Sequence, residues 1–318
     1  MGIFFRGAEY KMNDLFSPVW FANVAAAFIL SPLLFGIIAK VKAFFAGRKG
    51  IPLLQLYYDI FKLLRRGVIY SSSVSVFFAA APAITLSAVI CALLLVPCQK
   101  HGAFFAFDGD ILLFIYLFAL ARAFTVLAAI DTASSFEGMG GARELHFSIF
   151  SECALMTLLA VLSVHTSGDR SLSGIFSALS DFSSTSGLGA MALLLAAVGF
   201  FIVLLAENCR VPVDDPETHL ELTMIHEAMI LDYSGVDLGV IHYASALKLW
   251  VFSQIMVMIL FPTLPAYLVW VGIFAVSAAI GVVESITARF RLLKVPHYLM
   301  GAFAIELAAL ALLIWENI

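Results

Sequence analysis

The chain has 318 residues, of which 62% are hydrophobic and only 13% are charged. Because about a quarter of the residues in an ordinary soluble domain are charged, this composition excludes a largely water-exposed surface and implies that lipid surrounds much of the protein. The formal net charge of −4 is small, and we expect no nucleic-acid partner.

Eight apolar stretches approach the ~20 residues that a helix needs to cross a bilayer. The sixth is the shortest, contains Pro262 and precedes Pro265, and is expected to extend back through Tyr243. Between the first two stretches, residues 53–68 place apolar and polar side chains on opposite helical faces, which predicts an amphipathic helix in the membrane interface. The fold class is therefore all-α, with residues 1–318 forming one polytopic membrane domain. The predicted spans are 19–39, 74–96, 111–130, 147–164, 188–206, 249–264, 266–283 and 298–315.

The loops are strongly asymmetric in lysine and arginine, which concentrate on the cytoplasmic side of membrane proteins. If the first loop is cytoplasmic, thirteen basic residues fall on that side and four on the other. This bias predicts that both termini are periplasmic. The cytoplasmic loops available for docking would then lie at about residues 40–73, 131–146 and 207–242.

The third of these loops holds eight of the 22 acidic residues of the chain. Such a run is ordinarily a solvated surface, but here leucine, isoleucine and methionine are interleaved with the carboxylates. Asp215 followed by Pro216 is typical of a helix start, and Gly235 of a helix end. The eight residues are Glu207, Asp214, Asp215, Glu217, Glu221, Glu227, Asp232 and Asp237.

Charged side chains also interrupt the apolar spans, notably Arg122, Glu152 and Glu306. A charge at bilayer depth costs ~2.5–3.5 kcal/mol, so it usually faces a partner or a water-filled path. Glu144 and Glu152 share one face of the fourth helix, and we expect Glu207 to approach that face. Two interpretations stay open: a structural ion pair of Arg122 with a carboxylate, or a route for protons or cations.

No pattern for a metal or a cofactor is evident. The four cysteines form no CxxC pair, and His219 and His226 would need a third ligand to hold a metal ion. We therefore expect no cofactor in this chain.

Several segments resemble subunit 1 of NADH–quinone oxidoreductase, respiratory complex I. Residues 207–217, ENCRVPVDDPE, look like the A-E-T-N-R-A-P-F-D-L-P-E motif of that family, and residues 232–235, DYSG, look like its E-Y-S-G. Arg143 and Glu152 resemble its R-x8-E element. Arg48-Lys49-Gly50 resembles its R-K-G-P segment.

One departure from the complex I pattern indicates a particular branch of the family. Residues 214–227, DDPETHLELTMIHE, are similar to the hydrogenase branch of the family, the membrane subunits of formate hydrogenlyase and hydrogenase-4. The resemblance implies a non-catalytic, eight-helix anchor in a bacterial or archaeal cytoplasmic membrane. Its partners would be the [NiFe]-hydrogenase large and small subunits, an iron-sulfur protein and antiporter-like membrane subunits. The [NiFe] centre and the iron-sulfur clusters would lie in those partners.

The resemblance and the charge pattern together assign three groups of candidate residues. An ion-pathway or coupling role is expected for Glu144, Glu152, Glu207, Asp214, Glu217, Glu221, Glu227 and Asp232. A structural or ion-pair role is expected for Arg122, Arg143 and Arg210. Partner docking is expected for Arg48, Lys49, Arg65, Arg66, Asp215, His219 and His226.

Two alternatives remain. The first is the quinone-binding subunit 1 of NADH–quinone oxidoreductase. The second, from another class, is a stand-alone cation or proton transporter. The absence of an obvious internal repeat and the large apolar-rich loops argue against the transporter.

Overall fold

The computed structural model describes residues 18–71, 73–99, 101–166, 168–181, 187–214 and 224–317. Within these ranges the regular elements are helices, which confirms the all-α prediction. Eight of these helices are long and apolar enough to cross a membrane. The helices are α1 Pro18–Phe45, α2 Gln55–Leu64, α3 Val76–Leu95, α4 Asp110–Asp131, α5 Ser135–His165, α6 Leu172–Asp181, α7 Gly187–Glu207, α8 His226–Met229, α9 Gly235–Leu260, α10 Ala266–Ile286 and α11 Val295–Asn317, with the 3-10 turn η1 Leu292–Lys294 before α11.

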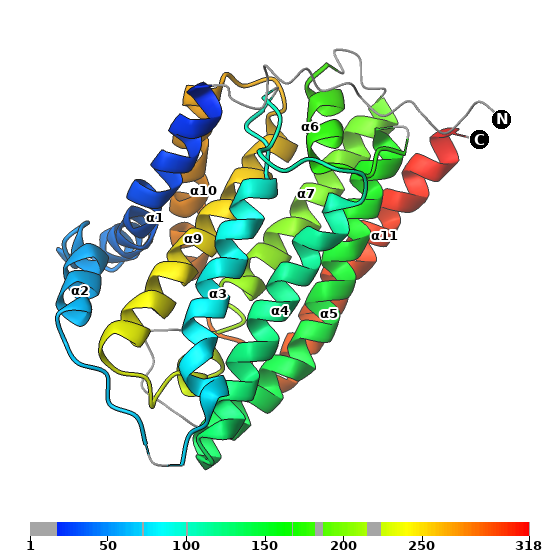
Figure 1. Cartoon of the computed structure of the whole chain (residues 1–318). Coiled ribbons are helices and arrows are strands. Elements are labelled where there is room, and N and C mark those ends of the chain that lie inside the picture. Colours follow the sequence, from blue (N-terminus) through cyan, green and yellow to red (C-terminus); the bar gives the residue numbers. More distant parts are fainter. Residues whose placement is uncertain are drawn as a thin grey trace.

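The long helices run side by side, with α11 along α5 and α7 at one edge of the bundle and α1 with α10 at the other (Figure 1). Helix α9 is central and packs against α1, α3, α7 and α10. In its most apolar stretch 78% of the residues are buried, against 28% in α10 and in α11. The edge helices therefore present apolar side chains outward, as helices in lipid do.

Helix α5 begins twelve residues before the predicted span, so most of the predicted loop at residues 131–146 is helical. Its polar first half is held by the segment that precedes α9. Arg143 donates from Nη1 to the carbonyl of Met224 at 2.8 Å. Gly140 packs so closely on the same segment that a Cβ there would lie 2.9 Å from the carbonyl oxygen of Ile225. These tertiary contacts give the polar residues of this stretch their partners, although hydropathy alone excludes the stretch from a span.

Helix α9 begins at Gly235, fourteen residues before the predicted span and further back than Tyr243. The prediction that Gly235 ends a helix is therefore wrong. Gly235 has a φ of 55°, and a Cβ there would collide with the carbonyl oxygen of Gly67. A left-handed backbone in close contact with another segment of the chain needs glycine. Lys248 consequently lies inside α9.

Helix α2 occupies the centre of the predicted amphipathic segment and lies beside α1 and α9 (Figure 1). None of its residues is buried, and Tyr58, Phe61 and Leu64 are exposed apolar side chains. The Tyr57 hydroxyl donates to the carbonyl of Ile29 in α1. Exposed aromatic and aliphatic groups on a short helix are typical of contact with a lipid interface.

Candidate functional site

Arg122 on α4 is the centre of a buried ionic cluster, its side chain only 8% exposed. Its Nε donates to Glu144 Oε1 on α5 at 3.1 Å, and its Nη2 donates to Glu207 Oε1 on α7 at 2.5 Å. Its Nη1 donates to Glu152, about two helical turns beyond Glu144 on α5. One guanidinium thus ties three helices together, as its fixed fork of donors permits.

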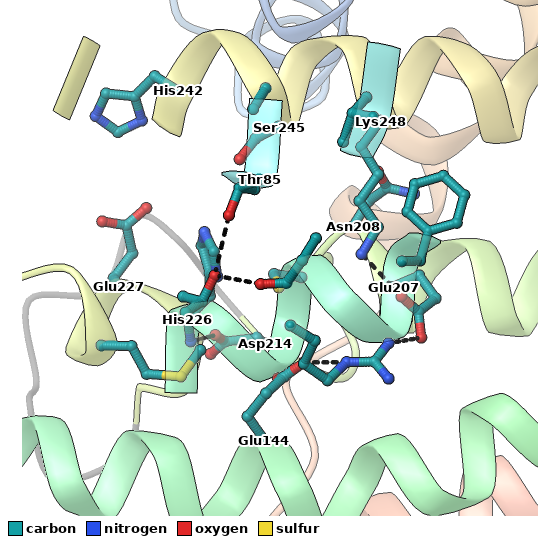
Figure 2. Close-up of a pocket in the computed structure, with 18 of the residues that line it drawn as sticks. Thr85, Glu144, Glu207, Asn208, Asp214, His226, Glu227, His242, Ser245 and Lys248 are labelled. Carbon is teal, nitrogen blue, oxygen red and sulfur yellow. Dashed lines mark hydrogen bonds and ion pairs between the residues drawn. The ribbon is translucent and has the colours of Figure 1, made fainter. Parts of the chain in front are cut away.

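Glu207 is the most heavily partnered carboxylate of this cluster. Lys248 Nζ on α9 donates to Oε2 at 2.8 Å, as Figure 2 shows, and Ser151 Oγ donates to Oε1 at 2.7 Å. Two cations, Arg122 and Lys248, face three carboxylates, Glu144, Glu152 and Glu207. When all five are ionised the formal charge is 2 − 3 = −1. The cluster therefore accommodates one additional proton without an excess of positive charge. We call these five residues the Arg122 cluster.

A cavity of about 110 Å³ lies beside the Arg122 cluster, large enough for several water molecules. Glu207 and Lys248 lie at one end of it, and Glu227 and His242 lie at the other (Figure 2). A smaller cavity of about 20 Å³ also borders Glu207. Ionisable groups, set among apolar ones, thus line a space from the long helices to the segment before α9.

A third and larger cavity, of about 450 Å³, lies between α1, α2 and α9. It shares Phe35, Arg210, Glu227 and His242 with the cavity beside the Arg122 cluster. The two spaces therefore adjoin at these four side chains.

Two further ion pairs fasten the loop that follows α7. Asp214 accepts from Arg289 Nη2 at 2.8 Å, and its other oxygen accepts from the backbone N–H groups of Ile225 and His226, each at 3.1 Å. Asp214 is 2% exposed. Asp214 therefore joins the backbone at residues 225 and 226 to the loop between α10 and α11, which carries Arg289.

Arg210 forms the second ion pair of this loop, with Glu284. Its Nη1 lies 3.7 Å from Glu284 on α10, whose other oxygen lies 3.2 Å from Lys42 Nζ on α1. The Arg210 guanidinium also stacks over Phe35, 4.2 Å from the ring centroid. These contacts link α7 to the opposite edge of the bundle.

Burial shifts the pKa values of two neighbouring side chains outside the spans, Glu227 and His226. Burial, reinforced by Asp214, raises the pKa of Glu227 to about 7. Burial, reinforced by the positive charge of Lys248, lowers the pKa of His226 to about 4. At neutral pH, His226 is therefore uncharged, whereas Glu227 exchanges a proton readily.

The structure places the predicted coupling residues unequally. Glu144, Glu152 and Glu207 meet at Arg122, and Glu227 lies at the far end of the adjoining cavity. Asp232 is exposed, and its backbone N–H donates to the buried Glu137. Glu217 and Glu221 lie outside the described residues.

The predicted docking residues also differ in location, some at the surface and one inside the bundle. Arg48, Lys49, Arg65 and Arg66 are exposed around α2. His226, in contrast, lines the inner cavity. Asp215 and His219 lie outside the described residues. In the part of the chain that the structure describes, no three histidine, cysteine or acidic side chains are placed to hold a metal ion.

Sequence reasoning missed Lys248, Ser151 and His242. Lys248 was counted among the loop charges, although the expected extension of the sixth span through Tyr243 includes it. In the structure it lies well inside α9, which begins at Gly235. Ser151 precedes Glu152 on the face that meets α7. Nothing local distinguishes His242, whose place in the cavity depends on tertiary packing.

Comparisons with known proteins agree with this architecture. The family model described as NADH dehydrogenase matches residues 19–315. The chain is 30% identical to Hydrogenase-4 component C of Escherichia coli strain K12, over 92% of this chain and 94% of that protein. It is 28% identical to Formate hydrogenlyase subunit 4 of the same organism, over 89% of this chain and 94% of that protein.

A solved structure of the membrane-bound sulfane sulfur reductase, an archaeal respiratory membrane complex, contains a chain with the same fold. The TM-score is 0.78 at 20% identity, covering 93% of this chain and 98% of the other. The chain therefore belongs to the NADH dehydrogenase family, that of complex I subunit 1, and is a multi-pass membrane subunit of the kind found in complex I-related hydrogenase and respiratory complexes.

Proposed function

We propose that this chain is the membrane anchor and coupling subunit of a membrane-bound [NiFe]-hydrogenase complex of the formate hydrogenlyase type. The names of the two relatives in Escherichia coli support this choice within the family. The hydrogenase-like residues 214–227 support it independently. The chain itself would carry no redox cofactor. The [NiFe] centre and the iron-sulfur clusters would belong to the large and small subunits and an iron-sulfur protein.

One observation carries the proposal: Glu207 is shared by Arg122 and Lys248 at one end of a mostly apolar cavity whose other end is Glu227. Charges interact strongly in such a low-dielectric space. A change of redox state in a docked arm would alter the field at Glu227 and favour uptake or release of a proton there. The Arg122 cluster, with one carboxylate in excess, would respond by changing its own protonation or pairing. Antiporter-like subunits in the membrane would receive that change and move protons or cations.

Docking would use the surface around α2 and the segment between α7 and α9. Arg48, Lys49, Arg65 and Arg66 form an exposed basic rim there. Asp214 pairs with Arg289, and the carbonyl of Met224 accepts from Arg143, so the described residues at the two ends of the segment are anchored to the bundle. The positive bias of these loops supports a cytoplasmic location for this face and external termini.

The test compares Glu207→Gln with wild type in the intact complex in sealed membrane vesicles. Glutamine keeps the shape but removes the charge that Arg122 and Lys248 share. We expect fewer ions to be pumped per turnover, measured as ion uptake and hydrogen production in the same vesicles. Asp108→Asn, an exposed carboxylate at the other end of the bundle, is the matched control. Unchanged pumping and turnover in Glu207→Gln would count decisively against the coupling role.

The 450 Å³ cavity beside α2 favours a second candidate, the quinone-binding subunit 1 of NADH–quinone oxidoreductase. The cavity combines an apolar approach past Phe35 with charged groups, Arg210 and Glu227, where it adjoins the inner cavity. A quinone needs both surfaces, one for its tail and one for its head group. Quinone-dependent turnover of the purified complex would favour this candidate, and hydrogen evolution that is indifferent to quinone would favour the first.

A further inference from the structure

Glu306 is a second buried acidic group, remote from the Arg122 cluster. It lies near the middle of α11 and is 0% exposed. Neither of its carboxyl oxygens has a hydrogen-bonding partner among the described residues. An ionised carboxylate in such a place would lose its hydration with no compensating cation, which is far more costly than burial of the neutral acid. Glu306 therefore carries a proton in this arrangement.

The neighbouring helix is shaped around this side chain. Gly199 on α7 faces Glu306, and a Cβ at position 199 would lie 2.6 Å from Glu306 Cγ and 2.9 Å from its Oε1. No real Cβ approaches other atoms so closely. A methyl group at position 199 would therefore displace the Glu306 side chain from the position that it occupies against α7.

Glu306 lies between the ionisable groups at the two ends of the bundle. Gly199 is eight residues before Glu207 on α7, which corresponds to ~12 Å along the helix axis. Glu316 is ten residues beyond Glu306 on α11, ~15 Å further, and lies within electrostatic range of His165 at the end of α5. The carboxyl group therefore occupies the otherwise apolar middle of the α5–α7–α11 unit.

The helices packed on α11 offer few other titratable groups at this depth. Helix α7 carries only Glu207, and α11 itself carries only His297, Tyr298 and Glu316 besides Glu306. None of these groups hydrogen-bonds to Glu306. The ionisable residues of α5 are Glu137, Arg143, Glu144, His146, Glu152, Cys153 and His165.

We propose that Glu306 is a proton-binding site inside the membrane, separate from the Arg122 cluster. Its ligand is the proton alone, because a single carboxyl group without further oxygen donors does not form a site for a metal cation. Proton binding here does not require a coupling role for Glu207, since no hydrogen bond joins the two side chains.

Infrared spectroscopy of the full-length chain in liposomes tests this site. A protonated carboxyl group has a carbonyl band separate from that of a carboxylate, and the band shifts when its proton is replaced by deuterium. We expect a protonated-acid band at pH 7 that Glu306→Gln removes and that shifts after transfer of wild type to D₂O. Glu227→Gln identifies the contribution of Glu227, whose pKa burial raises to about 7.

Two glycine variants check the geometry. Gly199→Ala should shift the Glu306 band because the new methyl group displaces the carboxyl group. Gly301→Ala on α11, where a Cβ meets nothing within 4 Å, should leave the band unchanged. The proposal is overturned if Glu306→Gln removes no protonated-acid band, or if the band is present but does not respond to D₂O. An unchanged band in Gly199→Ala would equally overturn it.

Discussion

Two of the regions in which the bundle holds acidic side chains, the Arg122 cluster and the site of Glu306, differ in their surroundings. In the cluster, three carboxylates face two cations and a serine hydroxyl. At Glu306 no cation of the described chain pairs with the carboxyl group, and the adjacent residue on α7 is glycine. The cluster pairs its acids with cations, whereas the second region holds an acid with no cation beside it in the described chain. Substitutions in the two regions should therefore change the stability of the chain by different amounts.

The largest expected effect comes from removing the central cation of the cluster. Arg122→Met leaves the buried Glu207 and two partly buried carboxylates with only Lys248, so we expect a loss of about 3–5 kcal/mol in the free energy of unfolding. Thermal denaturation of the detergent-solubilised chain measures it. Arg65→Met, at an exposed position where the guanidinium lies over Phe61, should cost much less. Equal losses in the two variants would contradict the central role of Arg122.

A glutamate-to-glutamine substitution in each region tests this difference directly. Glu207→Gln leaves Arg122 and Lys248 short of a charged partner and should destabilise the chain by about 3 kcal/mol. Glu306→Gln replaces a neutral acid with a neutral amide and should change stability by less than about 1 kcal/mol. Denaturation curves recorded side by side decide the order, and a larger loss in Glu306→Gln would refute the difference between the regions.

A smaller effect is expected from one hydrogen bond of the cluster. Ser151→Ala removes the hydroxyl that donates to Glu207 and should cost about 1.5–3 kcal/mol, the range for bonds to charged groups. Ser87→Ala is the control, because the Ser87 hydroxyl donates to the carbonyl of Ile84 in its own helix. If both serine variants unfold at the wild-type temperature, the Ser151 hydroxyl does not support Glu207.

The last effect is spread over a range of pH and concerns Glu227, which is neither paired like Glu207 nor isolated like Glu306. Its pKa is raised from 4.5 to about 7, so between these values the unfolded chain releases a proton that the folded chain retains. Its contribution to stability is present at low pH and is lost as the pH rises to about 7, by at most about 1.4 kcal/mol per pH unit.

A pH series of unfolding transitions measures this loss. Glu227→Gln should flatten the slope between pH 4.5 and 7, and Asp108→Asn should leave it as in wild type. A Glu227→Gln slope as steep as that of wild type would show that another group titrates there.

Much of the architecture was predictable because hydropathy and helical length are local properties. The eight spans were predicted in order, and α2 lies within the predicted amphipathic segment. The starts of α5 and α9 were misplaced because both helices begin with polar residues. Those residues are satisfied by partners distant in sequence, as Arg143 is by Met224.

The candidate site was predictable only in part. Glu144 and Glu152 share a face by helical spacing alone, and the cost of burying Arg122 required a partner. Which carboxylates would meet Arg122, and that Lys248 would join them, depended on the packing of α4, α5, α7 and α9. The pairing of Lys42 with Glu284 joins residues far apart in the chain, and no sequence spacing indicates it.

The sequence by itself determined that this chain is an all-helical membrane protein, which helices span, and which acidic residues need an explanation. The tertiary structure alone decided which acids are paired and which is left without a partner among the described residues. The reason is that hydrophobicity acts residue by residue, whereas the cost of a buried charge depends on the nearest opposite charge. That charge is brought by another helix.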